Sequence, residues 1–313
     1  MSPVSRQTLL ASAWLPVAAI VASIVSLCLG TSFAKSLFPV LGAQGTTVIR
    51  LAFAAAFLWL FWRPWRWPLT ARDAGRIALY GAVLGCMNLL FYLAIARIPL
   101  GIAIAIEFSG PLALAIATSR RASDFIWIGF AVLGLGLLLP IHEGVAGLDP
   151  LGVAFALGAA VMWALYIITG QRTGNVPSGQ ATSLGLAMAA LLVLPFGAAE
   201  ARAALLDPGL LLAGLAVALL SSAIPYSLEM VALKRLPKQT FGILLSLEPV
   251  VGALIAMAVI GEMLTPLQWV AIASIVVASA GSAMGVPTAN GRAPQETGQT
   301  GVLPLSTEER CTR

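Results

Sequence analysis

Apolar runs of about twenty residues recur along the chain, separated by short polar breaks. A helix needs about twenty apolar residues to cross roughly 30 Å of hydrocarbon. Water is absent there, so each run must satisfy its own backbone hydrogen bonds, which a helix does. Only 10% of the residues are charged and the mean hydropathy is +0.94, whereas soluble domains carry about 25% charged residues. We predict an all-α integral membrane protein.

The runs predict ten transmembrane helices, at residues 15–34, 46–62, 77–96, 100–118, 125–141, 151–169, 179–196, 209–231, 240–260 and 267–284. The first run is longer than the apolar region of a signal peptide, about 7–15 residues, so we expect it to remain as a span. Residues 285–313 are rich in Gly, Pro, Thr and charge and predict a disordered cytoplasmic tail.

The placement of basic residues predicts the orientation. With both termini cytoplasmic, the periplasmic loops hold only Lys35, Arg97 and Arg202 of the 18 lysines and arginines, and Arg50 lies within a span. Cytoplasmic loops carry such an excess in multi-pass proteins, so we expect a bacterial inner-membrane protein with the lipid bilayer as its main partner. The net charge of +5 therefore does not indicate nucleic-acid binding.

The chain repeats itself once. Residues 94–99 and Pro111 match residues 232–237 and Pro249, each 138 positions later. We predict two five-helix units, at residues 15–141 and 151–284. Because five is odd, the second unit enters the membrane from the opposite side. Inverted repeats with a site near the midplane are a common transporter plan.

Glu107 is the most informative charge. It lies seven residues past Leu100, about 10 Å into the membrane. Pro111 has no N–H to donate to the Glu107 carbonyl, which leaves that acceptor free and is expected to kink the helix. A carboxyl group, a free carbonyl and small neighbours would suit an ammonium group or a proton. A structural ion pair with a lysine or arginine is the alternative.

Four further charges lie within or at the ends of the spans, where each needs a reason. Glu248 precedes Pro249 and is the near-counterpart of Glu107 in the second repeat. Glu229 is five residues before Lys234, so we favour a local salt bridge over a functional role there. Arg50 and Lys35 could hold a carboxylate, neutralise a glutamate or extend to the membrane surface.

Uncharged polar and aromatic residues are the remaining site candidates. Asn88 and Tyr92 share one helix face, where they could line a cavity or join helices. Trp163, Tyr166 and Tyr226 could form cavity walls. We expect Pro225, like Pro111 and Pro249, to kink its helix.

Enzyme signals are absent from the sequence. The single histidine, His142, lies in a predicted loop, and no nucleophile, zinc-ligand or phosphate-binding motif is present. We predict no enzyme activity, no metal and no cofactor.

Several short motifs, taken together and in order, resemble the drug/metabolite transporter superfamily with two EamA-type repeats. The resemblance runs from about Trp14 to Met284. It rests on Ala34-Lys35-Ser36-Leu37-Phe38-Pro39, Arg50-Leu51, Met87-Asn88, Phe91-Tyr92-Leu93, residues 99–111, Trp163-Ala164-Leu165-Tyr166-Ile167, Gly170-Gln171-Arg172, Pro225-Tyr226-Ser227-Leu228-Glu229-Met230, Glu248-Pro249, Gly261-Glu262 and Leu264-Thr265-Pro266.

The resemblance implies ten helices, a central cavity and proton-coupled efflux of small neutral amino acids of the threonine and homoserine type. A zwitterionic amino acid would need an acid and a base. Our hypothesis assigns Glu107 to the ammonium group or the coupled proton, and Arg50 or Lys35 to the carboxylate, with alternating access between the repeats. The alternatives are a multidrug or other metabolite exporter and, more remotely, a membrane-embedded enzyme. A homodimer stays open.

Overall fold

The computed structural model describes residues 3–98, 100–119, 122–138, 148–202, 206–260 and 265–284. Four earlier points lie outside these residues: Pro99, His142, the motif at residues 261–264 and the predicted tail at 285–313.

Every regular element in the described residues is helical, and no strand occurs among them, as the hydropathy pattern predicts. The helices are α1 (Pro3–Lys35), α2 (Phe38–Trp62), α3 (Ala71–Ile95), α4 (Leu100–Thr118), α5 (Ala122–Leu138), α6 (Pro150–Gln171), α7 (Ser178–Ala201), α8 (Pro208–Ala218), α9 (Ile224–Leu233), α10 (Lys238–Leu245), α11 (Leu247–Ile260) and α12 (Pro266–Met284). A 3-10 turn η1 (Pro64–Arg66) follows α2, and a π-helical turn η4 (Leu219–Ala223) joins α8 to α9.

Within the described residues, six continuous helical stretches are long and apolar enough to cross a membrane. They are Trp14–Ser36, Phe38–Trp62, Ala71–Ile95, Pro150–Gln171, Ser178–Ala201 and Pro208–Leu233. Shorter apolar helices cover Ile102–Thr118, Asp124–Leu137 and Trp269–Ser282. The chain is a multi-pass membrane protein, because no other environment accommodates so many apolar helices.

Three predicted spans differ in detail from the structure. The second is preceded by a short helical segment that begins at Phe38, where Pro39 suits the first turn of a helix, and Gly42 with its φ of 62° kinks the chain between this segment and the span proper. The eighth contains the π-helical turn just before Pro225. The ninth is broken at Ser246 into α10 and α11, because Pro249 has no N–H for the Leu245 carbonyl.

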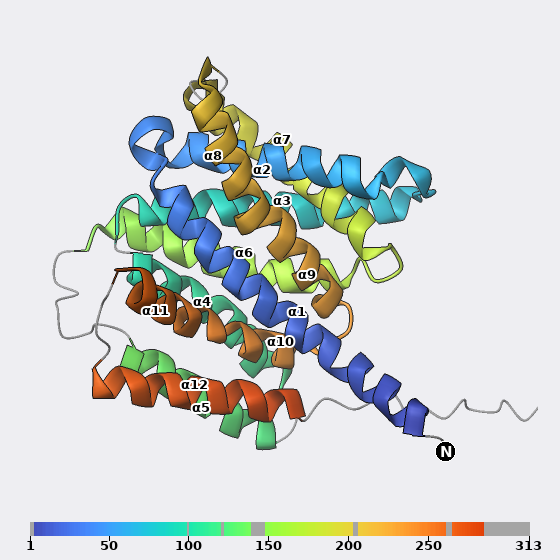
Figure 1. The fold of residues 1–313 in the computed structure, drawn as a ribbon, viewed down its shortest axis with the longest axis vertical. Helices are drawn as coiled ribbons and strands as arrows, with labels where there is room; N and C mark the ends of the chain where they lie inside the picture. Colours follow the sequence, from blue (N-terminus) through green and yellow to red (C-terminus); the bar gives the residue numbers. More distant parts are fainter. Residues whose placement is uncertain are drawn as a thin grey trace, which may run out of the picture.

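The helices pack side by side in one bundle (Figure 1). α2 packs against α7, α5 against α12, and α4 against α10. α3 contacts α6 and α7, while α1 lies along α9 and η4. The start of α1 and the end of α12 lie on the same, right-hand side of the view. The middle of the bundle is therefore surrounded by five helices, α1, α2, α3, α6 and α9.

The bundle has an apolar core and an apolar outer surface, as expected when lipid covers it, but its interior also holds charged side chains. Leu60 and Leu191 are among its most exposed side chains, whereas Arg50, Glu107 and Glu229 are buried. The three buried residues are examined below as a candidate site.

Glycines set the helix spacing around this interior. A Cβ on Gly85 would lie 3.0 Å from the Ala189 Cα of α7, and one on Gly81 would meet the Gly185 carbonyl oxygen. Gly81 and Gly85, four residues apart on one face of α3, thus allow close packing against α7. Gly110 of α4 lies directly against the Ala160 backbone of α6, which draws Glu107 toward the centre.

We expect Gly110→Ala to destabilise the protein by about 1–3 kcal/mol, because its Cβ would lie 2.6 Å from the Ala160 carbonyl carbon. Gly129→Ala is the matched control, since nothing lies within 4 Å of its Cβ position. Thermal unfolding of both variants in one detergent checks the prediction. Equal melting temperatures would show that α4 and α6 do not touch at Gly110.

Candidate functional site

A cluster of buried polar side chains is contributed by α1, α2, α3, α4, η4, α9 and α11. Burying a charge in a membrane interior costs at least about 2.5–3.5 kcal/mol, so such residues usually have a function. The cluster consists of Ser23, Arg50, Asn88, Glu107, Ser221, Ser222, Glu229 and Glu248.

Arg50 is the cation of the cluster and is only 2% exposed. Its Nη1 donates to the Ser221 carbonyl oxygen at 3.2 Å, and its Nη2 donates to the Asn88 side-chain oxygen. Its guanidinium carbon lies 4.5 Å from the centroid of the Tyr92 ring. Three elements, η4, α3 and α2 itself, therefore fix one guanidinium group.

Pro225 explains why the Ser221 carbonyl is available. In a regular helix residue 225 would donate its N–H to the carbonyl of residue 221, and proline has none. The π-helical turn η4 also leaves the Leu220 carbonyl to accept from the Ser26 hydroxyl at 2.6 Å. π-helical turns often occur at functional sites. The predicted disruption at Pro225 is present, and other helices use the acceptors it frees.

Asn88 connects Arg50 to the second half of the chain. Its side-chain oxygen also accepts from the Tyr226 hydroxyl at 2.9 Å, while its amide donates to the Leu84 carbonyl at 2.8 Å. The side-chain oxygen of Asn88 thus holds both Arg50 and Tyr226.

Arg50 makes no ion pair with any carboxylate among the described residues. Its Nε and the Tyr92 hydroxyl are both buried without a hydrogen-bond partner. A buried guanidinium held only by neutral groups is costly. This arrangement can accept a carboxylate from outside the chain.

Glu229 forms a second centre and is 3% exposed. Its Oε1 accepts from the Ser23 hydroxyl at 2.8 Å and its Oε2 from the Tyr166 hydroxyl at 2.9 Å. The Tyr166 ring lies 5.4 Å from that of Tyr80 and 6.1 Å from that of Tyr226. The carboxyl group is therefore held by hydroxyls from α1 and α6.

The predicted salt bridge between Glu229 and Lys234 is wrong. Lys234 follows the end of α9, and its Nζ donates instead to the Val176 carbonyl oxygen of the loop before α7. Burial lowers the pKa of Lys234 to about 8. Because α9 turns Glu229 into the bundle and Lys234 toward this loop, the two side chains serve different contacts.

Glu107 and Glu248 are both buried and lie within electrostatic range of one another, and Glu107 also of Arg50. The Oε2 of Glu248 has no hydrogen-bond partner. Nearby on the same helix as Glu107, the Phe108 ring meets Trp163 of α6 edge-on at 6.2 Å. Neither Glu107 nor Glu248 forms an ion pair with a residue that the structure describes. Such carboxyl groups can take up a proton or a positively charged group.

The structure brings together most of the residues that the sequence singled out. Lys35 is the exception, since it ends α1 as an exposed side chain. Of its three predicted roles, only extension to the membrane surface fits this position.

Three residues of the cluster, Ser23, Ser221 and Ser222, and the neighbouring Tyr80 escaped the sequence reasoning. Ser221 and Ser222 form a polar pair in an apolar run four and three residues before Pro225, a signal that the run is not a plain span. Ser23 carries no such signal, because a serine in a membrane helix commonly bonds its own backbone.

No group of three or more His, Cys, Asp and Glu side chains is close enough to hold a metal ion in the part of the chain that the structure describes. The chemistry open to the cluster is the binding of charged groups and the transfer of protons.

Comparison with known proteins identifies the family to which the chain belongs. The threonine/homoserine exporter RhtA of Escherichia coli (strain K12) is 47% identical over 273 residues, which cover 87% of this chain and 92% of that protein. The model of the EamA-like transporter family matches residues 150–284. The chain belongs to the EamA-like transporter family. The resemblance to EamA-type members of the drug/metabolite transporter superfamily is confirmed.

Further comparisons agree with this result. RhtA of Salmonella typhimurium (strain SL1344) is 47% identical over the same lengths. The uncharacterized transporter YwfM of Bacillus subtilis is 28% identical over 222 residues, 68% of this chain and 72% of that protein. A solved crystal structure of a protein that is 21% identical to this chain aligns with a TM-score of 0.63. The alignment covers 87% of this chain and 98% of the other protein, so the two share the fold.

The hydrogen bonds of this EamA-like protein predict a non-additive pair of substitutions. Tyr226→Phe removes one neutral hydrogen bond and should cost about 0.5–1.5 kcal/mol. Asn88→Leu strips an acceptor from a buried guanidinium and should cost about 1.5–3 kcal/mol. The double variant should melt like Asn88→Leu alone, because the Tyr226 bond ends on Asn88. Thermal unfolding of the three variants tests this, and additive losses would contradict the network.

Proposed function

We propose that this protein exports small neutral amino acids of the threonine and homoserine type across the bacterial inner membrane. Two findings support the proposal. Relatives 47% identical over 87% of the chain are threonine/homoserine exporters. The bundle also buries Arg50, which forms no ion pair with a carboxylate among the described residues. This arginine could bind the carboxylate of the amino acids that the relatives export.

An amino acid at neutral pH carries a carboxylate and an ammonium group. In the proposed site the free Nε edge of Arg50 binds the carboxylate through charge-assisted hydrogen bonds. Glu107, with Glu248 beside it, binds the ammonium group or the coupled proton. Trp163, Tyr166 and Tyr226 form walls that exclude larger substrates. No cofactor is needed, because export requires only binding and a change of access.

The ten-helix inverted repeat remains part of the proposal. If α8, η4 and α9 count as the eighth span and α10 with α11 as the ninth, exchanging the two halves maps helix neighbours onto helix neighbours. α2–α7, α4–α10 and α5–α12 map onto themselves, α3–α6 maps onto α9–α1, and α3–α7 maps onto α8–α2. This supports repeats at residues 15–141 and 151–284, and the family match at 150–284 agrees with the second.

The contact between Asn88 and Tyr226 adds weight to the symmetry. The two residues are 138 positions apart, the same offset as the repeated motifs, so they occupy equivalent places in the two units. Equivalent residues of two symmetry-related units meet only near the axis between them. In the alternating-access mechanism that we propose, the repeats move about this axis while the site opens to one side and then the other.

Proton coupling would act through the buried carboxyl groups. A group that binds a proton when facing the periplasm and releases it toward the cytoplasm can drive an amino acid outward. Glu107 is our candidate, and Glu229, bound to two hydroxyls, is the second. α1 begins and α12 ends on the same side of the bundle, and the distribution of basic residues supports a cytoplasmic location for that side.

Efflux of labelled threonine and homoserine from loaded cells, with and without a pH gradient, tests the function. We expect gradient-dependent export by the wild type. Arg50→Gln should reduce export roughly ten- to a hundred-fold, the equivalent of one charge-assisted hydrogen bond. Glu107→Gln should abolish the response to the gradient.

Arg172→Gln is the control, since Arg172 is exposed and outside the cluster. If Glu107→Gln exports like the wild type at every pH, Glu107 does not carry the proton. If inserted and folded wild type moves neither amino acid, the proposed substrate is wrong, and competition by lipophilic cations would favour a multidrug exporter instead.

A further inference from the structure

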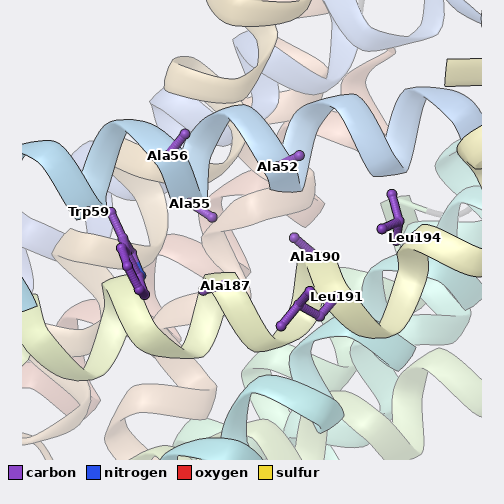
Figure 2. Close-up of a pocket in the computed structure, with 8 residues that line it drawn as sticks. All are labelled: Ala52, Ala55, Ala56, Trp59, Ala187, Ala190, Leu191 and Leu194. Atoms are coloured by element: carbon purple, nitrogen blue, oxygen red, sulfur yellow. The ribbon is translucent and has the colours of Figure 1, made fainter. Parts of the chain in front are cut away.

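A hollow lies between α2 and α7 on the outer surface of the bundle, apart from the buried polar cluster. Its volume is about 350 Å³, within the range of about 300–1,000 Å³ that small-molecule sites occupy. Figure 2 shows the two helices running alongside it, with Trp59 at one end and Leu194 toward the other. Its lining consists of Ala52, Ala55, Ala56, Trp59, Ala187, Ala190, Leu191 and Leu194.

The lining is wholly apolar and faces lipid. Leu191 is 66% exposed, and Trp59 and Leu194 are exposed as well. The hollow exists because alanines on both helices end at Cβ while the flanking side chains are large. From Ala52 to Trp59 it extends roughly 10 Å along α2, which is most of one leaflet's hydrocarbon depth of about 15 Å.

One end of the hollow meets a basic segment. The Trp59 ring lies 6.1 Å from the Trp65 ring, and Trp65 stands between Arg63 and Arg66 in the sequence. Both arginines are exposed, and neither forms an ion pair with a residue that the structure describes. Tryptophan and arginine at such a position mark the level of the lipid head groups.

The basic segment is held rigidly beside α7. The side-chain amide of Gln180 donates to the carbonyl oxygens of Pro64 and Trp67, each at 3.2 Å. Arg63 takes a left-handed φ of 49°, and its N–H donates to the Trp59 carbonyl at 3.0 Å. The backbone that carries the two arginines is therefore fixed relative to α2 and α7.

We propose that the hollow binds one acyl chain of an anionic phospholipid whose phosphate is held by Arg63 and Arg66. The apolar lining matches the chain, and the unpaired arginines match the charge of the head group. Clusters of arginine next to a membrane helix on the cytoplasmic side attract anionic lipids in this way.

Close helix contact bounds the hollow at its Leu194 end. A Cβ on Gly45 would lie 3.0 Å from the Ala201 nitrogen, and one on Gly197 would lie 2.9 Å from the Gly45 nitrogen. We favour a lipid chain over a helix of a second copy as the occupant, because the exposed arginines at the other end match an anionic head group.

The test measures which lipids stay bound to the full-length protein. The protein is reconstituted in nanodiscs of equal parts phosphatidylglycerol and phosphatidylcholine, extracted gently, and examined by native mass spectrometry. The wild type should retain phosphatidylglycerol preferentially. The double variant Arg63→Gln with Arg66→Gln should retain it roughly ten- to thirty-fold less, because each arginine near the surface attracts the lipid independently. Ala56→Phe, which fills the hollow, should also release it.

Two matched controls keep the result specific. Arg202→Gln removes an exposed arginine at the other end of α7, and Ala154→Phe enlarges an exposed alanine of α6. Both should retain the lipid, and all variants should melt like the wild type in detergent without added lipid. Equal retention of the two lipids, or unchanged retention in the double variant, would overturn the proposal. The proposal would also fail if the wild type could be cross-linked as a dimer, and Ala56→Phe abolished that dimer while still retaining the lipid. None of these readouts depends on transport.

Discussion

The structure depends on one constraint: hydrocarbon offers no hydrogen-bond partner to the backbone, so every carbonyl that a helix releases must be bound by another part of the protein. Pro225 and the π-helical turn before it release two carbonyls in the middle of the bundle. Arg50 and Ser26 bind them from two other helices. A break that would weaken an isolated helix thereby becomes the point where α1, α2 and α9 are joined.

Small residues make this joint possible. A Cβ on Gly30 would lie 2.7 Å from the Leu220 carbonyl carbon, so glycine lets α1 approach the π-helical turn directly. Close approach places Ser23 against Glu229 and the turn against Arg50. The charged groups are thus distributed over separate helices, and Arg50 and Glu229 are each held by neutral groups. A site that must bind a zwitterion and release it again benefits from charges that do not neutralise one another first.

Much of this could be predicted from the sequence, because charge inside an apolar run is conspicuous. Arg50, Glu107 and Glu248 stood out for that reason, and the spacing of Asn88 and Tyr92 placed them on one face. The role of Glu229 could not be predicted, because its distance from Lys234 along the chain suggested a local pair, while the direction of its side chain depends on packing. The short helical segment before Gly42 and the break at Ser246 also escaped, because prolines start or break helices according to which carbonyls their surroundings satisfy.

The π-helical turn η4 has a further consequence for how the eighth span can change. One additional residue in a turn rotates everything after it by about 100° relative to everything before it. The face of α8 that packs on α2 and the face of α9 that carries Tyr226 and Glu229 are therefore aligned by the length of this turn, independently of side-chain chemistry. Loss of a single residue there would leave the span as apolar as before and still point its polar residues at lipid. In this helix, insertions and deletions are constrained more strictly than substitutions.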